Sequence, residues 1–467
     1  LFANPVIGTT TSLINSTLPV NTGDVRETNG FTSSGDGGGA KWKFTGVTGQ
    51  TPSQTPAQLV DGLLNDANGN QWVLIKSSTD IIDKLGLSED SLRAAITAYD
   101  NVDLNGNTLT FTTTRTTIST LSGSVKNGVL NITLSDTSFR ALFFLNGGGF
   151  VDTEINITIP QGGSAELFRP VGDDSYITNC NIDGGVTDNG TIINGDSYLV
   201  QVDSTKDVKN FKLNNNKIKN VSYVHLKTNT TTTRQDGWQT NFNTFTGIYK
   251  EGAGLNSPSG LCDNFQVIGN SFLTHKGIDL GFYSLYIACA SGENIQIKNN
   301  YFEGVVDQCI HIEEAANNFT ITGNTGDVDC KGGVIAFNEN DIGGTLAHPK
   351  RIIVSNNVFT KSGINRESAS VGLWLTNNIS TEPPAENTLI SNNIFSGFEI
   401  GYSFDSYIDN SFFINNNYAI DCTSGYSCNN YMAGIANNVS QDCQNAIINT
   451  SSAVCDIRDH TATRCNN

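Results

Sequence analysis

One short segment of the sequence brings together several groups capable of acid–base chemistry. It reads Val305-Val306-Asp307-Gln308-Cys309-Ile310-His311-Ile312-Glu313-Glu314. Side chains alternate between the two faces of a strand, so if the isoleucines face the core, His311 and Glu313 face solvent together. Glu314 then follows at the end of the strand. Hydrolysis of a glycosidic bond requires two carboxyl groups, because one protonates the leaving oxygen while the other activates water or attacks the sugar.

Segments one repeat away add further carboxylates. Asp279 stands between apolar residues in the run 277–280, and Glu339 follows closely after the apolar run 334–337. Because adjacent parallel strands lie about 4.8 Å apart, carboxylates in successive repeats fall in the glycosidase range of about 5–9.5 Å. Stacked like charges also raise the pKa of one carboxyl group, as a general acid requires. We predict a catalytic group drawn from these residues: Glu313, Glu314, Asp279, Glu339, Asp307 and His311.

The competing interpretation is that these side chains are solvated surface. The chain has 45 acidic residues, and Asp and Glu are mostly exposed in folded proteins whether or not they have a function. His311 has the same simple alternative, as an exposed polar residue on a strand face. The sequence alone leaves both interpretations open.

Aromatic residues indicate where a sugar would be held, because the apolar face of a sugar ring packs on an aromatic ring. Trp374 lies between Leu373 and Leu375, so it faces solvent if the leucines face the core. The segment 223–261 reads as a long insertion that carries Trp238 and Tyr249. We predict four substrate-binding residues: Trp374, Trp238, Tyr249 and Asp405. By contrast, Trp42 and Trp72 are expected to pack the N-terminal region.

The elements that position these residues follow from a repeat. Asn-Asn or Gly-Asn steps recur as VIGN (267–270), IKNN (297–300), ITGN (321–324), VSNN (354–357), ISNN (390–393), INNN (414–417) and IANN (435–438). Alternating apolar residues precede each step, and a Phe or Tyr follows most of them. The shortest separations are 24 residues (300 to 324) and 21 residues (417 to 438). A period this short, with strand-type alternation, predicts an all-β parallel solenoid with one coil per repeat.

The N-terminal part has a different character. Residues 1–80 read as a cap region, in which the glycine-rich turn at 35–39 joins two short strands. Residues 81–105 contain a helix capped by Ser88, with Leu92, Ala95, Ile96 and Tyr99 on one face. We expect this helix to cover the open end of the solenoid, which then occupies residues 106–467. Other insertions are expected at 339–349, 361–369 and 377–386.

Composition excludes several functions. The formal net charge is −18 and the isoelectric point is about 4.6, which disfavours nucleic acid and anionic membrane surfaces as partners. Three Cys residues (289, 309 and 330) are spaced by about one coil, which favours buried, stacked, reduced thiols over disulfides. The sequence has no Cys-x-x-Cys pair, and His225, His275 and His348 have no metal-ligand spacing. No metal and no cofactor is expected.

The N-terminal motifs carry a family resemblance. The run VRETNGFTSSGDGGGAKWKF, followed by NGNQWVLI, a capped helix and VDLNGNTLTF, resembles the start of bacteriophage tailspike proteins of the pectate-lyase-like type. The resemblance covers about residues 20–115 by motif, and 177–450 only by the coil pattern. It implies a right-handed parallel β-helix, usually a homotrimer, that binds and often depolymerises a bacterial surface polysaccharide. It further implies a place in the phage virion, through a segment that precedes this chain.

The resemblance implies hydrolysis of a capsule or O-antigen by a carboxylate pair, and three alternatives stay open. A polysaccharide lyase on the same fold would need a uronic acid substrate and a Tyr, His or Lys base. A receptor-binding spike without catalysis would keep the aromatic residues but have no close carboxylate pair. A secreted bacterial β-helix enzyme is the third.

Overall fold

A computed structural model describes most of the chain. The described residues are 8–29, 40–53, 63–74, 87–98, 101–201, 205–226, 233–253, 261–289, 292–313, 316–338, 340–342, 345–347, 350–361, 370–376, 387–405, 412–428, 432–449 and 455–465. The fold is the predicted all-β, right-handed parallel β-helix. The chain divides into two compact units, residues 1–169 with 174–185, and residues 170–173 with 186–467. None of the described helices is long and apolar enough to cross a membrane.

The first unit begins with a small antiparallel sheet. Its strands are β1 (Val25–Thr28), β2 (Ala40–Phe44), β4 (Gln71–Leu74) and β3 (Leu63–Asn65), in that spatial order, and helix α1 (Thr10–Ile14) precedes them. Trp42 and Trp72 are completely buried, as predicted. The indole of Trp72 donates to Asp66 Oδ2 at 3.0 Å, so the buried polar atom of the ring is satisfied. The glycine-rich turn at 35–39 lies outside the described residues.

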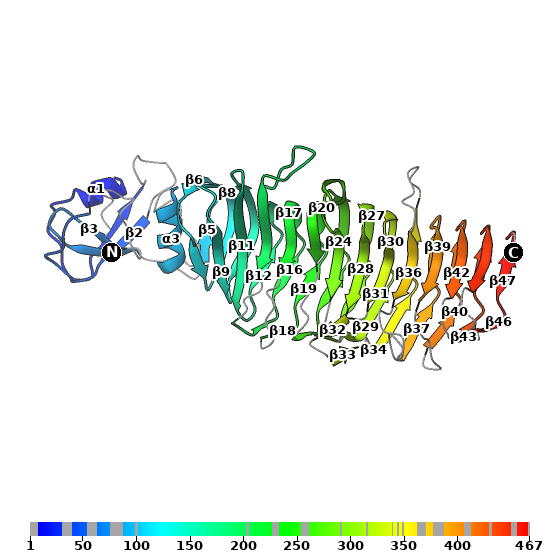
Figure 1. Ribbon diagram of the computed structural model, residues 1–467. Helices are drawn as coiled ribbons and strands as arrows, with labels where there is room; N and C mark the ends of the chain where they lie inside the picture. The colour runs from blue at the N-terminus through cyan, green and yellow to red at the C-terminus, as the bar shows by residue number, and fades with distance from the viewer. Residues whose placement is uncertain are drawn as a thin grey trace. The chain divides into compact units, whose positions relative to one another are not determined.

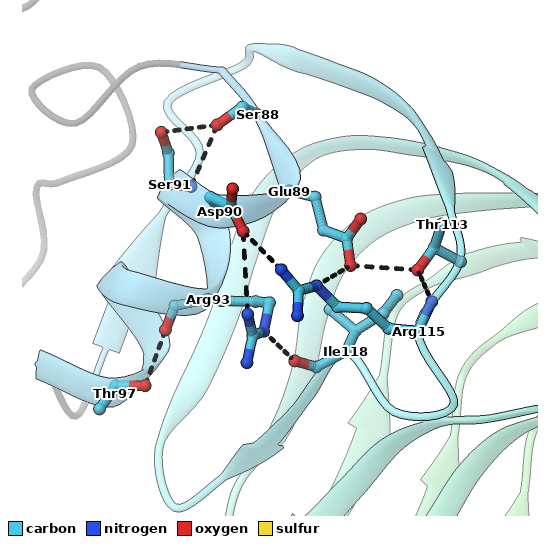
Figure 2. Close-up of polar contacts among 9 residues, drawn as sticks. All are labelled: Ser88, Glu89, Asp90, Ser91, Arg93, Thr97, Thr113, Arg115 and Ile118. Carbon is cyan, nitrogen blue, oxygen red and sulfur yellow. Dashed lines mark hydrogen bonds and ion pairs between the residues drawn. The ribbon is translucent and has the colours of Figure 1, made fainter. Parts of the chain in front are cut away.

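Helix α3 (Glu89–Ala98) confirms the predicted capped helix (Figure 2). Ser88 Oγ accepts a hydrogen bond from Ser91 N at 3.1 Å, the geometry of an N-cap. Leu92, Ala95 and Ile96 are buried, so the predicted apolar face is the packed face. The first turn is tied to the strands beside it by Arg115, whose guanidinium pairs with Glu89 at 3.1 Å and Asp90 at 3.0 Å.

Coils of parallel strands follow in the first unit. They are β5 (Asn101–Asp103), β6 (Thr108–Thr113), β7 (Ser119–Leu121), β8 (Ser124–Leu134), β9 (Arg140–Asn146), β10 (Gly149–Thr158), the first part of β11 (Gly163–Gly172), β12 (Tyr176–Thr178) and β13 (Asn181–Asp183). Strand β8 pairs in parallel with β5 and β6 on one side and with β10 on the other. Each coil therefore adds its strands to those of the coil before.

The second unit stacks further coils in three main strand rows (Figure 1). The first row is β16 (Lys212–Asn214), β19 (Gln239–Asn241), β22 (Gln266–Ile268), β26 (Gln296–Lys298), β29 (Ala316–Thr322), β34 (Lys350–Ser355), β37 (Thr388–Ser391), β40 (Phe412–Asn415), β43 (Met432–Ala436) and β46 (Cys455–Arg458). The second row is β17 (Lys217–Leu226), β20 (Thr244–Ala253), β23 (Ser271–His275), β27 (Tyr301–Val306), β30 (Thr325–Cys330), β35 (Val358–Thr360), β38 (Ile394–Ser396), β41 (Tyr418–Ile420), β44 (Val439–Gln441) and β47 (Thr461–Thr463).

The third row carries most of the predicted site. It consists of β14 (Gly195–Gln201), the ends of β17 and β20, β24 (Leu285–Cys289), β28 (Gln308–Glu313), β31 (Gly333–Asn338), β36 (Val371–Thr376), β39 (Ile400–Phe404), β42 (Ser424–Cys428) and β45 (Asn445–Asn449). Four short strands lead into the first row: β15 (Val208–Lys209), β18 (Arg234–Asp236), β21 (Leu261–Asp263) and β25 (Gly292–Glu293). A hairpin of β32 (Asn340–Ile342) and β33 (Thr345–Ala347) lies in the predicted insertion at 339–349.

A ladder of buried asparagines joins the first row to the second. The Asn ladder is Asn216, Asn243, Asn270, Asn300, Asn324, Asn357, Asn393, Asn417 and Asn438, all at most 1% exposed. In each step the Oδ1 of one Asn accepts from both the backbone N and the Nδ2 of the Asn one coil earlier, as at Asn324, where the two distances are 3.0 and 2.9 Å. Its own Nδ2 donates to Asn357 and to the carbonyl of Ile297. Every polar atom of the side chain is thereby satisfied.

The residue before each ladder Asn explains why the sequence repeats Asn-Asn or Gly-Asn. It adopts the left-handed conformation, as at Asn299 (φ 55°), Gly323 (φ 68°) and Asn356 (φ 57°), which Gly and Asn tolerate better than other residues. The aromatic residue two positions after the ladder Asn forms a second stack inside the coils. The rings of Phe245, Phe272 and Phe302 lie 4.9 and 5.1 Å apart.

The described cysteines are reduced thiols and nearly all of them are buried, as the sequence favoured. Among the described residues whose side chains are placed, eight cysteines are buried, one is half-buried, and all are free thiols. Cys309 and Cys330 face each other in adjacent coils, with their sulfur atoms 3.9 Å apart. Burial raises the pKa of the Cys309 thiol, so these residues act as small apolar side chains in the core.

The predicted insertion at 223–261 is wrong over much of its length. Strands β18, β19 and β20 lie inside it and pair with their neighbours in adjacent coils. Asn243 is a full member of the Asn ladder. The residue before it is Phe242, which takes the left-handed conformation (φ 59°) with its side chain 60% exposed. The usual Asn-Asn signal is absent at this coil, which is why the repeat is hidden there.

Removing one ladder side chain should destabilise the protein strongly. Asn324→Ala leaves buried donors and acceptors of Asn300, Asn357 and Ile297 without partners, so we expect a loss of about 2–4 kcal/mol in the free energy of unfolding. Denaturant unfolding measures this loss. The matched control is Asn356→Gly, at an exposed left-handed position, which should change stability by less than about 0.5 kcal/mol. Equal effects of the two variants would contradict the structural role of the ladder.

Candidate functional site

Of the predicted catalytic residues that the structure describes, Glu313 and His311 lie on β28 in the third row, and Asp279 and Asp307 lie in the turns beside that row. Glu313 is the last residue of β28 and lies opposite Asn338 of β31 in the next coil. Glu314 and Glu339 lie outside the described residues. Asp405 follows β39, three coils beyond Glu313, because Asn338 is opposite Thr376 and Leu375 is opposite Phe404. Three strand spacings amount to about 14 Å, too far for Glu313 and Asp405 to form a hydrolytic pair.

Of two further predicted carboxylates, Asp279 is exposed and Asp307 is hydrogen-bonded to the backbone. Asp279 is exposed, but it lies on a single 3-10 turn, η2 (Ile278–Leu280), and not on a strand. This turn is favoured by Gly281, which ends it in the left-handed conformation (φ 75°). Asp307 lies between β27 and β28, and its Oδ2 accepts from the backbone N of Ser284 at 2.7 Å. The Asp307 carboxylate therefore already serves to fix the neighbouring turn.

His311 is buried, contrary to the prediction that it faces solvent. It is only 2% exposed. Its Nδ1 is hydrogen-bonded to Gln308 Oε1, and the ring of Tyr283 meets it edge-on at 6.3 Å. Tyr283, from the turn after η2, thus covers the imidazole while being 53% exposed itself. A general acid–base role for His311 would require access that this arrangement does not give.

Trp238 and Tyr249 are also buried, so their predicted role in contacting substrate is wrong. Trp238 is completely buried against Phe211, at a ring distance of 4.8 Å, and donates to the carbonyl of Val208. Tyr249 is 1% exposed, and its hydroxyl donates to Asp188 Oδ2 at 2.8 Å. Both residues belong to regular coils and not to an insertion. Their side chains therefore pack the core and its edge.

Trp374 and Asp405, two of the predicted substrate-binding residues, are in direct contact. The indole Nε1 of Trp374 donates to Asp405 Oδ2 at 2.6 Å, and Ser403 Oγ donates to Asp405 Oδ1 at 3.2 Å. Trp374 is half-buried between the completely buried Leu373 and Leu375. The side chains in register on either side, Ala336 and Ser403, are small and buried. The ring is fixed in orientation and reaches solvent.

A further aromatic residue of the third row was missed by the sequence analysis. Tyr283 projects from the turn before β24, and its hydroxyl lies 3.4 Å from Gln308 Oε1. It covers His311, which is two coils from Trp374 through Ala336. Two strand spacings correspond to about 10 Å, so Tyr283 and Trp374 mark two places along one row. The only sequence signal for it is an aromatic residue directly after a Gly-bounded turn.

A cation lies at the N-terminal end of the same row. Lys250 Nζ pairs with Asp196 Oδ1 at 2.8 Å and lies over the rings of Tyr223, at 5.4 Å, and Phe282, at 5.1 Å. The ring of Tyr198 stacks on Tyr223 at 5.2 Å. Burial, followed by the charge of Glu251, raises the pKa of the Tyr223 hydroxyl. Tyr223 therefore keeps its proton near neutral pH and does not serve as a base. The aromatic rings and Asp196 together fix the position of Lys250.

Two other rows contain carboxylates at coil spacing. In the second row Glu303 lies opposite Asp327, and both reach solvent. On the short strands, Asp236, Asp263 and Glu293 occupy one register in three successive coils. Burial raises the pKa of the Asp263 carboxyl, an effect that Arg234 at 2.9 Å opposes and Glu293 reinforces. No group of three or more His, Cys, Asp or Glu in the described part of the chain could hold a metal ion.

Comparisons with known proteins give likenesses of fold at low sequence identity. No protein-family model and no curated protein matches the sequence. A tailspike protein mutant of E. coli bacteriophage HK620 in complex with pentasaccharide is 13% identical, covers 86% of this chain and 77% of its own, and has a TM-score of 0.47. The A-module of the Azotobacter vinelandii mannuronan C-5 epimerase AlgE6 is 10% identical, with coverage of 81% and 94% and a TM-score of 0.45. The Streptococcus pneumoniae surface protein and adhesin PfbA is 13% identical, with coverage of 80% and 95% and a TM-score of 0.37.

His275 supports the turn beside the site and should make stability depend on pH. Its Nε2 donates to the carbonyl of Lys250 at 3.0 Å, and its Nδ1 accepts from Gly277 N at 3.1 Å. Burial lowers the pKa of His275 to about 4. Because the folded-state pKa lies below the ordinary 6.5, the stabilisation is complete above pH 6.5 and is lost as the pH falls to 4. The loss should be about 3 kcal/mol.

Unfolding at a series of pH values measures this effect as a difference between the wild type and His275→Gln. The difference in the free energy of unfolding should shrink as the pH falls from 6.5 to 4. A difference that stays constant over this range would show that His275 does not titrate as described.

Proposed function

We propose that the chain is part of a phage tailspike that binds a bacterial surface polysaccharide and hydrolyses its glycosidic bonds. The observation that carries the proposal is Trp374, an indole held by Asp405 on a strand face with small residues on both sides. A pre-positioned aromatic face beside a carboxylate offers both the apolar surface and the hydrogen-bond acceptor that a sugar ring needs. Tyr283, about two strand spacings away, supplies a second aromatic contact along the same row.

The N-terminal region supports the proposal independently. The sequence that resembles tailspike proteins folds into the expected hairpin β1–β2, the strand of Trp72 and the capped helix α3. The third row then offers an extended strip on which several sugar units can lie in succession. In keeping with the resemblance, the protein would act as a homotrimer at the bacterial surface, carried there by the virion.

The catalytic step is assigned to the carboxylates at the end of β28. One protonated carboxyl group donates its proton to the glycosidic oxygen, and a second carboxylate accepts a proton from the attacking water or attacks the sugar. Glu313 is the last residue of this strand and Glu314 follows it in the sequence, while Glu339 follows Asn338, the residue opposite Glu313 in the next coil. We assign His311 and Asp307 to positioning roles and not to proton transfer. His311 is buried, and the Asp307 carboxylate fixes the neighbouring turn. Asp279, exposed on η2, stays a candidate carboxylate.

Loss of the indole should weaken polysaccharide binding. Trp374→Ala removes the stacking surface and should raise the Kd for oligosaccharide by about 10- to 100-fold, or about 1.4–2.7 kcal/mol. Isothermal titration calorimetry measures the change. The matched control is Phe413→Ala, which removes a 60% exposed aromatic residue from the first row. If both variants bind like the wild type, the third row is not the binding face.

Loss of the strand-end carboxylates should abolish cleavage while sparing binding. Glu313→Gln or Glu314→Gln should lower kcat by about 10²- to 10⁴-fold, the usual contribution of a general acid or base. Mass spectrometry should identify the wild-type products as oligosaccharides that have gained one water. The control is the double variant Glu303→Gln, Asp327→Asn, which neutralises a carboxylate pair in the second row. Full activity in both single variants, or products with an unsaturated terminal uronate, would reject the mechanism.

A further inference from the structure

The third row has a marked imbalance of charge. Its strand segments are 195–201, 220–226, 249–253, 285–289, 308–313, 333–338, 371–376, 400–404, 424–428 and 445–449. The acidic residues in these segments are Asp196, Glu251 and Glu313, and Asp307, Glu314, Glu339, Glu399 and Asp405 directly adjoin them. Lys250 is the only Lys or Arg within the segments, and Lys219 and Lys227 directly adjoin them. The row therefore carries more carboxylates than cations, with one cation inside its strands.

That one cation is already engaged. Lys250 Nζ is 2.8 Å from Asp196 Oδ1 and is held between the rings of Tyr223 and Phe282. The nearest lysine in the turn that follows β23, Lys276, is also taken up: its Nζ lies 3.7 Å from Asp188 Oδ2 and 3.4 Å from the hydroxyl of Tyr249. A carboxylate or phosphate on a ligand bound beside Lys250 or Lys276 would have to break one of these ion pairs to gain a counter-charge.

The contacts that the row does offer suit hydroxyl groups. Asp405 presents carboxylate oxygens that accept from Trp374 and Ser403, and an ionised carboxylate only accepts hydrogen bonds. A sugar hydroxyl can donate to such an oxygen, whereas a uronate or phosphate group would be repelled by it. The net charge of −18 opposes the approach of a polyanion over a longer range.

We infer that the third row selects an uncharged polysaccharide and rejects polymers that carry uronate, sialic acid or phosphate groups. This assignment rests on the proposed function and specifies its substrate class. It also argues against β-elimination, because that reaction requires a uronic acid. Hydrolysis requires no partner other than water.

The test is a panel of purified bacterial capsular and O-antigen polysaccharides, divided by charge, with each uronate-containing polymer also supplied in carboxyl-reduced form. The comparison of native and carboxyl-reduced forms is matched, since the two differ only at the carboxyl carbon, where a carboxylate is replaced by a neutral CH2OH group. Reducing ends should be released from uncharged or carboxyl-reduced polymers and not from their native acidic forms. KM for a cleaved polymer should be the same at low and high NaCl concentration.

A charge-changing variant checks the structural reason. Asp196→Asn releases the Lys250 ammonium from its ion pair, so binding of a native acidic polymer should improve several-fold at low salt and lose that gain at high salt. Asp421→Asn, outside the row, should bring no such gain. Cleavage of native acidic polymers at least as fast as their reduced forms would overturn the substrate assignment and leave the proposed hydrolase standing. Neither binding nor product with any polymer would overturn the proposed function, and the assignment with it.

Discussion

The structure of the second unit depends on the Asn ladder. A coil of a β-helix must turn a corner with its backbone polar groups buried, and such groups are costly unless they are hydrogen-bonded. Each ladder Asn meets this need, as Asn270 does through bonds to Asn300 and to the carbonyl of Thr240. Because each side chain bonds to the next coil, the ladder also sets the register of the stack. The first and second strand rows, on either side of the ladder, therefore stack in the same register.

The ladder shows how much of the fold could be predicted. The Asn-marked coils and the capped helix have local sequence signals, and both were predicted. The Phe or Tyr that follows most Asn steps was noted, but its stacking inside the coils was not predicted. The coil around Asn243 was missed because Phe242 occupies the left-handed position in place of Asn or Gly. Trp238 was then assigned to a loop, although it is completely buried. One unusual residue at the corner thus changed the interpretation of a whole coil.

Carboxylate neighbours in the second row and on the short strands that lead into the first row could have been found by counting from the ladder. Glu303 and Asp327 each stand three residues after a ladder Asn, at 300 and 324, and they are opposite each other. Asp236, Asp263 and Glu293 each stand seven residues before one, at 243, 270 and 300, and they share a register. The distance along the chain is constant here because no turn of variable length intervenes.

In the third row, the number of residues between the ladder Asn and a given register position is not constant. Residues in register there are His311, Ala336 and Trp374, which follow their ladder Asn residues at 300, 324 and 357 by 11, 12 and 17 positions. The turns between the second and third rows vary in length. Counting residues from the ladder therefore predicts neither the burial of His311 nor the contact between Trp374 and Asp405. In repeat folds, insertions often map to the loops of one face. The fixed ladder corner keeps the coils stacked while the turns beside the third row change in length, so the third row can differ from coil to coil without disturbing the stack.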